Sequence, residues 1–147
     1  MATLKEILCS NENRPKVVRD AAQLVDGEVS AKGGLSGLAI KAGYKAVKTV
    51  KPDLVTDAID TLLDRFVERL EPFHAEWIAA GKAQPFDAFL NARTSRVANA
   101  LLGVTDDRAR TIANSTIKRT YETLRPHGEK NVVAAIPQLG RLLNRYL

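Results

Sequence analysis

Apolar side chains recur at the spacing of an α-helix between residues 53 and 71. The apolar positions in this stretch are Leu54, Val55, Ala58, Ile59, Leu62, Leu63, Phe66, Val67 and Leu70. Such a wide stripe is typical of a helix that buries one face against other elements, and acidic residues recur between the apolar ones. No stretch of the sequence alternates with period two over enough residues to predict a strand. The chain is therefore predicted to be all-α and built round this helix.

Capping residues, prolines and glycines divide the rest of the chain into further helices. Thr3 and Glu6 have the spacing of a capping box, and Asn13 before Pro15 is typical of a helix start. Gly33 fits the left-handed position after a helix end. The predicted helices are a short one after Thr3, then 13–31, 36–51, 53–71 with a kink or restart at Pro72, 73–80, 86–102, 105–124, 128–135 and 137–146. A chain of 147 residues has the length of one ordinary domain, so we expect a single compact multi-helix domain of six to eight helices over residues 1–147.

Charge is unevenly distributed along the chain. Residues 1–52 carry a net charge of +4, residues 53–81 a net −5 and residues 82–147 a net +6, within an overall +5. A basic balance is typical of proteins that bind nucleic acids or anionic surfaces. The acidic centre lies between basic flanks, however, so the folded chain can pair its own opposite charges. The net charge is therefore weak support for a nucleic-acid or membrane partner.

A glycine cluster precedes the predicted helix 36–51. Gly33, Gly34 and Gly37, with Ser36 at the helix start and Lys32 beside them, could present backbone N–H groups and positive charge to a phosphate. Their spacing matches neither a P-loop nor a dinucleotide-binding motif, and no strand leads into them. We therefore favour a joint between two helices, with a phosphate or anion site at Gly33 to Ser36 as a further alternative.

Three lysines lie on one face of the same predicted helix. Lys41, Lys45 and Lys48 fall within about 60° of one another on a helical wheel, opposite small apolar residues. A face without Trp, Phe or Leu argues against attachment to a membrane surface. The lysines could dock an acidic partner protein, or they could pair with the carboxylates of the following helix. Those carboxylates share one side of their helix and belong to Asp53, Asp57, Asp60 and Asp64.

Residues 102–119 are similar in pattern to a helix-turn-helix. Gly103 would lie in the turn and Thr105 would cap the second helix. The basic residues that could then contact nucleic acid are Arg108, Arg110, Lys118 and Arg119. Asp106 and Asp107 oppose this interpretation, because they would occupy the first turn of the recognition helix and repel phosphates. An ordinary helical hairpin is preferred.

The sequence does not favour an enzyme, a metal or a cofactor. Glu71 and His74 have the Glu-x-x-His spacing of di-iron bundles, but Pro72 interrupts the motif and His127 has no Glu three residues before it. His74 is therefore expected at the surface or in helix packing. Cys9 lies near the chain end, and no serine occupies a nucleophile elbow.

Four segments carry a resemblance to a known family. In chain order they are GLSGLAIKAGYKAVKTVKP, LLDRFVERLEPF, ALLGVTD and IPQLGRLLNRYL. They resemble a family of small uncharacterised bacterial helical proteins that is known only as a domain of unknown function. The resemblance implies a bacterial protein with a helical fold and brings no activity, cofactor or site residue.

The sequence supports a ranked set of functions. No secretory signal and no apolar run of about 20 residues is present, so we expect a cytoplasmic protein. The first hypothesis is a non-catalytic interaction protein, monomer or homodimer, whose basic helix docks an acidic protein. A nucleic-acid-binding module is the alternative, and a phosphate or anion receptor is third.

Overall fold

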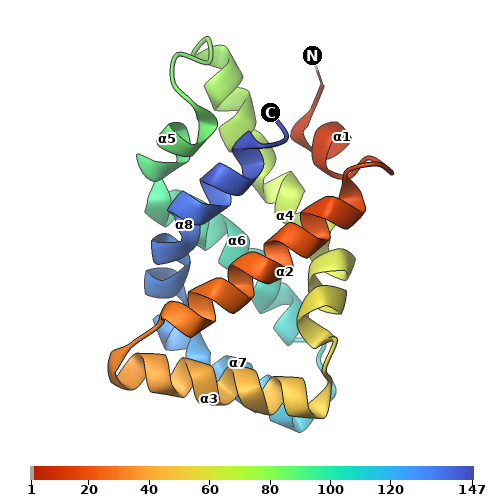
Figure 1. Cartoon of the computed structure of the whole chain (residues 1–147), viewed down its shortest axis with the longest axis vertical. Helices are drawn as coiled ribbons and strands as arrows, with labels where there is room; N and C mark the ends of the chain where they lie inside the picture. Colours follow the sequence, from red (N-terminus) through yellow and green to blue (C-terminus); the bar gives the residue numbers. More distant parts are fainter. Residues whose placement is uncertain (1) are drawn as a thin grey trace.

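The computed structural model describes residues 2–147, without the side chains of Leu35 and Ser36, and the described residues contain no strand. The helices are α1 (Leu4–Leu8), α2 (Arg14–Ala31), α3 (Gly34–Val50), α4 (Leu54–Ala79), α5 (Phe86–Asn91), α6 (Thr94–Ala109), α7 (Ser115–Leu124), the 3₁₀ turn η1 (Arg125–His127) and α8 (Gly128–Asn144). Figure 1 shows α2 crossing the front of the molecule, with α3 and α7 below it. The predicted all-α class is confirmed.

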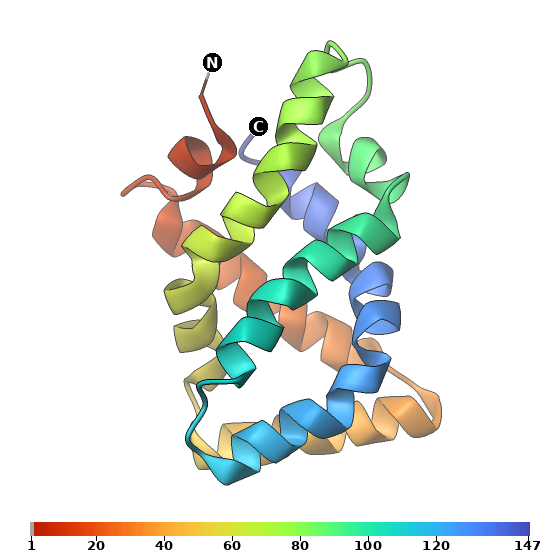
Figure 2. The ribbon, with the colours of Figure 1, turned by 180° about the vertical axis from the view of Figure 1, so that it is seen from behind.

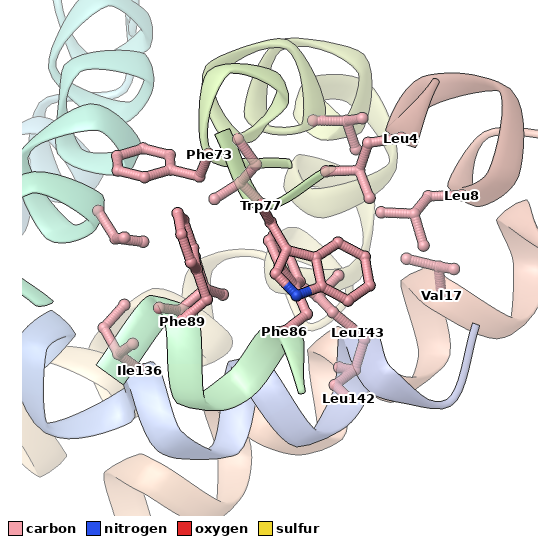
Figure 3. Close-up of a cluster of buried hydrophobic side chains, with 14 of the residues drawn as sticks. Leu4, Leu8, Val17, Phe73, Trp77, Phe86, Phe89, Ile136, Leu142 and Leu143 are labelled. Atoms are coloured by element: carbon pink, nitrogen blue, oxygen red, sulfur yellow. The ribbon is translucent and has the colours of Figure 1, made fainter. Parts of the chain in front are cut away.

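Most buried side chains belong to one body formed by α1, α2, α4, α5, α6 and α8. Its centre is an aromatic cluster in which the Phe86 ring lies 5.1 Å from Trp77 and 6.4 Å from Phe89, measured between ring centroids. Figure 3 shows Leu4 and Leu8 from α1 and Ile136 from α8 around this cluster. Each large apolar side chain buried there contributes roughly 1.5–3 kcal/mol.

A glycine lets α5 and α8 come close together. A Cβ placed on Gly140 would lie 2.6 Å from the Cβ of Asp87 and 2.8 Å from its Cα. Such distances are well inside van der Waals contact. The contact explains why a glycine stands in the interior of α8, where it costs about 1 kcal/mol in helix propensity relative to alanine.

Helices α3 and α7 form a separate layer across one end of the body, which we call the α3/α7 layer. Both views show the two helices side by side. Helix α3 lies in front of α7 in Figure 1 and behind it in Figure 2. Gly43 of α3 faces Thr120 and Leu124 of α7, whose side-chain carbons lie 3.0 and 3.1 Å from the position of an added Cβ. Among the described side chains of this layer, none that is large and apolar is fully buried.

Three helix ends differ from the sequence-based prediction. Helix α6 passes through Gly103 without a turn, and the Thr105 hydroxyl donates to the Leu102 carbonyl within the helix instead of capping a new one. The following helix, α7, begins after Asn114, whose side-chain oxygen accepts from the N–H groups of Thr116 and Ile117. The predicted segment 86–102 is also divided, between α5 and α6. An Asn followed by Ser and Thr is a helix-capping signal that the sequence analysis left unused.

Prolines and glycines do not always end helices here. Helix α4 continues through Pro72, and α8 continues through Pro137 where two helices were predicted. Pro72 is exposed, so the carbonyl that loses its N–H partner can meet water. At the α2–α3 joint Gly34, not Gly33, takes the left-handed conformation, with φ of 71°. Gly33 is extended and caps α3.

Candidate ligand-binding cavity

A cavity of about 770 Å³ lies between the α3/α7 layer and the body. Its lining comes from α3, the first turns of α4, the last turn of α6, the loop 110–114 and α7, with Val29 added from α2. A volume of this size lies within the ~300–1,000 Å³ that is usual for small-molecule sites. No prediction from the sequence placed a site here.

Most of the lining is apolar. The aliphatic side chains are Val29, Ile40, Val47, Val50, Leu54, Ala58, Leu62, Ile112, Ala113, Ile117 and Leu124. Each helix of the site turns its apolar stripe inward, as amphipathic helices do. Of these side chains only Leu62 is fully buried, because the cavity leaves the others without a packing partner on one side.

A polar network fixes one wall of the cavity and joins α6, α7 and η1. The Arg125 guanidinium donates to both carboxylate oxygens of Asp106, at 2.7 and 3.0 Å. The Tyr121 hydroxyl donates to Asp106 and lies 2.9 Å from the Thr105 hydroxyl. Hydrogen bonds from Arg125 hold the pKa of Asp106 below its usual range, and burial followed by contact with Asp106 raises the pKa of Tyr121. Tyr121 is therefore a protonated donor committed to the network.

Tyr44 separates the cavity from a neighbouring groove. The Tyr44 hydroxyl donates to Asp26 of α2, and burial together with this contact raises the pKa of Tyr44. The ammonium of Lys48 lies 3.5 Å from the Asp26 carboxylate and 5.0 Å from the Tyr44 ring centroid. The groove has a volume of about 550 Å³, and its lining is Val29, Ser30, Lys41, Tyr44, Lys45, Lys48 and Thr49.

The lining of the cavity contains three charged side chains, those of Lys51, Asp57 and Arg108. Lys51 and Asp57 pair with each other at 3.7 Å. Arg108 donates from Nη1 to the Thr111 hydroxyl at 3.1 Å. Within the described part of the chain no carboxylate lies within salt-bridge distance of Arg108. One guanidinium in the lining therefore lacks a counter-charge.

The predicted basic and glycine-rich site is only partly assembled. Lys41, Lys45 and Lys48 share the groove beside Tyr44, as their spacing predicts. Lys32 instead pairs with Glu28 on α2 at 3.5 Å, Gly33 and Gly34 form the α2–α3 joint, and the Ser36 side chain is outside the described residues. Whether these residues bind an anion or an acidic protein stays a prediction.

The carboxylate row of α4 does not face the three lysines. Arg14 of α2 lies 3.0 Å from Asp60 and 3.3 Å from Asp64. Asp57 forms an ion pair with Lys51. Of the three lysines, Lys48 pairs with Asp26 instead. The expectation that this acidic row neutralises the lysines is wrong, because α2 and not α3 crosses the acidic face of α4.

The four basic residues that were predicted to contact nucleic acid lie in different parts of the structure. Arg108 lines the cavity, and Arg110 contacts Asp107 within the same helix end. Lys118 and Arg119 are exposed on α7, beyond the loop 110–114. Because α6 runs through Gly103, the proposed turn of a helix-turn-helix does not exist. The four residues are not brought together on one recognition helix.

Glu71 and His74 have structural roles. The Glu71 carboxylate accepts from the backbone N–H groups of Leu4 and Lys5, at 3.1 and 3.3 Å, and so caps α1. His74 is buried against Trp77 and Phe86, and burial lowers its pKa. In residues 2–147, as far as the structure describes them, no group of three or more His, Cys, Asp or Glu side chains is placed to hold a metal ion.

No curated protein and no solved structure matches this chain. Among the helices of the described chain, none combines the length and apolar character needed to cross a membrane. The sequence profile described as "Family of unknown function (DUF6918)" matches residues 4–147, which confirms the resemblance noted from the four segments. The chain belongs to this family of unknown function.

Proposed function

We propose that this protein is a non-catalytic binding protein that takes a small, largely apolar molecule into the cavity under the α3/α7 layer. The observation that carries the proposal is the cavity of about 770 Å³ with its aliphatic lining. Apart from Gly43, the rest of the lining consists of ten polar or charged side chains from separate helices and loops, which can orient a ligand within the aliphatic part of the site.

Packing physics supports a ligand. Protein interiors are close-packed, and voids larger than a water molecule are few in a domain. Each Å² of apolar lining that stays wet forgoes about 25 cal/mol of burial free energy. A ligand that covered Ile40, Val47 and Ile117 would recover that free energy, whereas the chain alone leaves these side chains half-buried.

The way the α3/α7 layer is attached supports access to the cavity. The layer contributes no large side chain to the buried core of the described chain, so its local opening costs less than opening the body. The left-handed Gly34 at one end of α3 and the Lys51–Pro52 segment at the other are short joints. The layer is therefore the part of the molecule that can move to admit a ligand.

Fluorescence of the neutral apolar probe N-phenyl-1-naphthylamine tests the proposal. We expect saturable binding of one probe per chain to the wild type. Val47→Trp fills the cavity from α3 and should weaken binding at least tenfold. Leu38→Trp is the matched control on the same helix, because Leu38 is 65% exposed, and it should bind as the wild type does.

Two results would contradict the proposal. One is the absence of saturable probe binding to the folded wild type. The other is equal affinity of the Val47→Trp and Leu38→Trp variants, since binding would then occur outside the cavity. The bacterial cytoplasmic location, the acidic protein partner and the choice between monomer and homodimer stay predictions from the sequence.

A further inference from the structure

We infer that the ligand is an anionic amphiphile, whose head group binds Arg108 at the mouth of the cavity while its apolar chain lies inside. This inference rests on the proposed function, because Arg108 lines the same cavity. It assigns a chemical class to the ligand and a recognition role to one residue.

Arg108 is held in place for such a contact. It lies in the last turn of α6, and its Nη1 donates to the Thr111 hydroxyl, which itself donates to the Arg108 carbonyl at 2.9 Å. A guanidinium has five N–H donors in one plane, so the others stay available for an anion. Restricting the guanidinium through Thr111 lowers the conformational entropy that binding would cost.

The charge balance of the cavity points to an anion. The lining contains three charged side chains, and Lys51 and Asp57 neutralise each other. Arg108 therefore gives the lining an uncompensated positive charge. Other arginines near this end are already paired, Arg110 with Asp107 and Arg125 with Asp106.

The position of Arg108 suits an amphiphile better than a small inorganic anion. Arg108 is exposed, so an anionic head bound to it keeps contact with water and avoids the cost of burying an ion pair. The same lining contains aliphatic side chains from other elements, among them Leu54, Ile112 and Ile117. A planar guanidinium binds carboxylate and phosphate oxygens in pairs, so both head groups are compatible with this site.

The lysine groove is the other place for an anionic head. Val29 and Tyr44 line both hollows, so the groove adjoins the cavity. In the groove, however, Asp26 offsets part of the charge of Lys48, and Tyr44 donates its hydroxyl to the same carboxylate. Arg108 lines the cavity directly and has no such competitor, which favours the α6–α7 end.

Displacement of N-phenyl-1-naphthylamine by three ligands of equal chain length tests the inference. The ligands are dodecanoate, dodecyl phosphate and dodecanol, each below its micelle concentration. We expect the wild type to bind at least one of the anions about ten- to a hundredfold more tightly than dodecanol, as charge-assisted hydrogen bonds allow. The anion bound more tightly identifies the head group.

Charge variants locate the head group. Arg108→Gln should abolish the preference for the anion and leave the affinity for dodecanol unchanged. Arg119→Gln is the matched control, because it removes the same charge from the exposed face of α7 outside the cavity, and it should keep the preference.

Each of the other outcomes contradicts a specific part of the inference or of the proposed function. If the probe and dodecanol bind but neither anion is preferred, the cavity stands and the role of Arg108 is wrong. If the preference survives in Arg108→Gln and is lost in a Lys41→Gln/Lys45→Gln variant, the head lies in the lysine groove and the inference is overturned. If not even the neutral probe binds, the proposed function and this inference both fail.

Discussion

The body and the α3/α7 layer differ in how their helices are held. In the body, buried side chains from six helices form one core that includes Phe86, and Gly140 lets α8 come into close contact with Asp87 of α5. In the layer, the described apolar side chains are half-buried or exposed, and the link to α6 is the polar network at Asp106. Free energy of folding is thus concentrated in the body, while the layer borders the cavity. The difference teaches that the helices that supply the buried core are not the ones that border the cavity on this side, and under the proposed function the less stable layer would admit the ligand.

The largest expected effect is a loss of folding stability when a core side chain of the body is removed. Phe86 is 1% exposed and contacts His74, Trp77 and Phe89. Phe86→Ala should lower the free energy of unfolding by about 3–5 kcal/mol, because it removes apolar burial and leaves a cavity. Urea denaturation followed by circular dichroism measures the change. Leu38→Ala in the layer should stay within about 0.5 kcal/mol of the wild type, and a comparable loss in the two variants would refute the contrast.

The next effect compares one glycine from each region. Gly140→Ala should destabilise the chain by about 1–2 kcal/mol, since the new methyl group meets the Asp87 backbone and the overpacking cost exceeds the gain in helix propensity. Gly43→Ala meets only side-chain ends of Thr120 and Leu124, which can shift. We expect this variant to be within about 0.5 kcal/mol of the wild type. Thermal unfolding of both variants checks the pair, and equal shifts in Tm would contradict it.

Fold class and the long helices could be predicted from the sequence because they depend on local patterns. The apolar stripe of α4 and the proline starting α2 act within a few residues, so both were found. Gly103 was read as a helix end because its neighbours favour a turn. In the structure α6 continues there because Val97, Ala98, Leu102 and Val104 are buried in the body. Tertiary packing outweighed the local glycine signal, as it does for weak propensities.

The cavity could not be predicted, for a different reason. An apolar helix face has the same sequence whether another helix or an empty space lies against it. The volume depends on how α3 and α7 cross the ends of α4 and α6, which no local spacing records. The same holds for the lysines: their common face was predicted, but their neighbour, Asp26 in place of the α4 row, follows from the order in which helices cross. Arg108 was singled out for its charge, and only the fold places it at the cavity.

A moderate effect concerns the link between the two regions. Asp106→Asn leaves Arg125 without its carboxylate partner and should cost about 1–2 kcal/mol at neutral pH. The folded-state pKa of Asp106 is lowered, so its stabilisation is complete above the unfolded pKa of about 3.9 and disappears as the pH falls through the lower folded value. The difference in Tm between wild type and variant should therefore be constant from pH 5 to 7 and shrink towards pH 2. A difference that grows in acid would contradict this role.

The smallest effect isolates the layer from the body. Asn114 caps α7 by accepting from two backbone N–H groups, and it is exposed. Asn114→Ala should cost α7 about 0.5–1 kcal/mol, which corresponds to roughly two- to fivefold faster amide hydrogen exchange in that helix. Asn114→Asp keeps an oxygen acceptor and adds a favourable charge at the helix start, so it should exchange no faster than the wild type. Amides of α5 and α8 should exchange at wild-type rates in both variants. Acceleration spread equally over α5, α7 and α8 would mean that the layer unfolds only with the body, and ligand access would then need global opening rather than movement of α3 and α7.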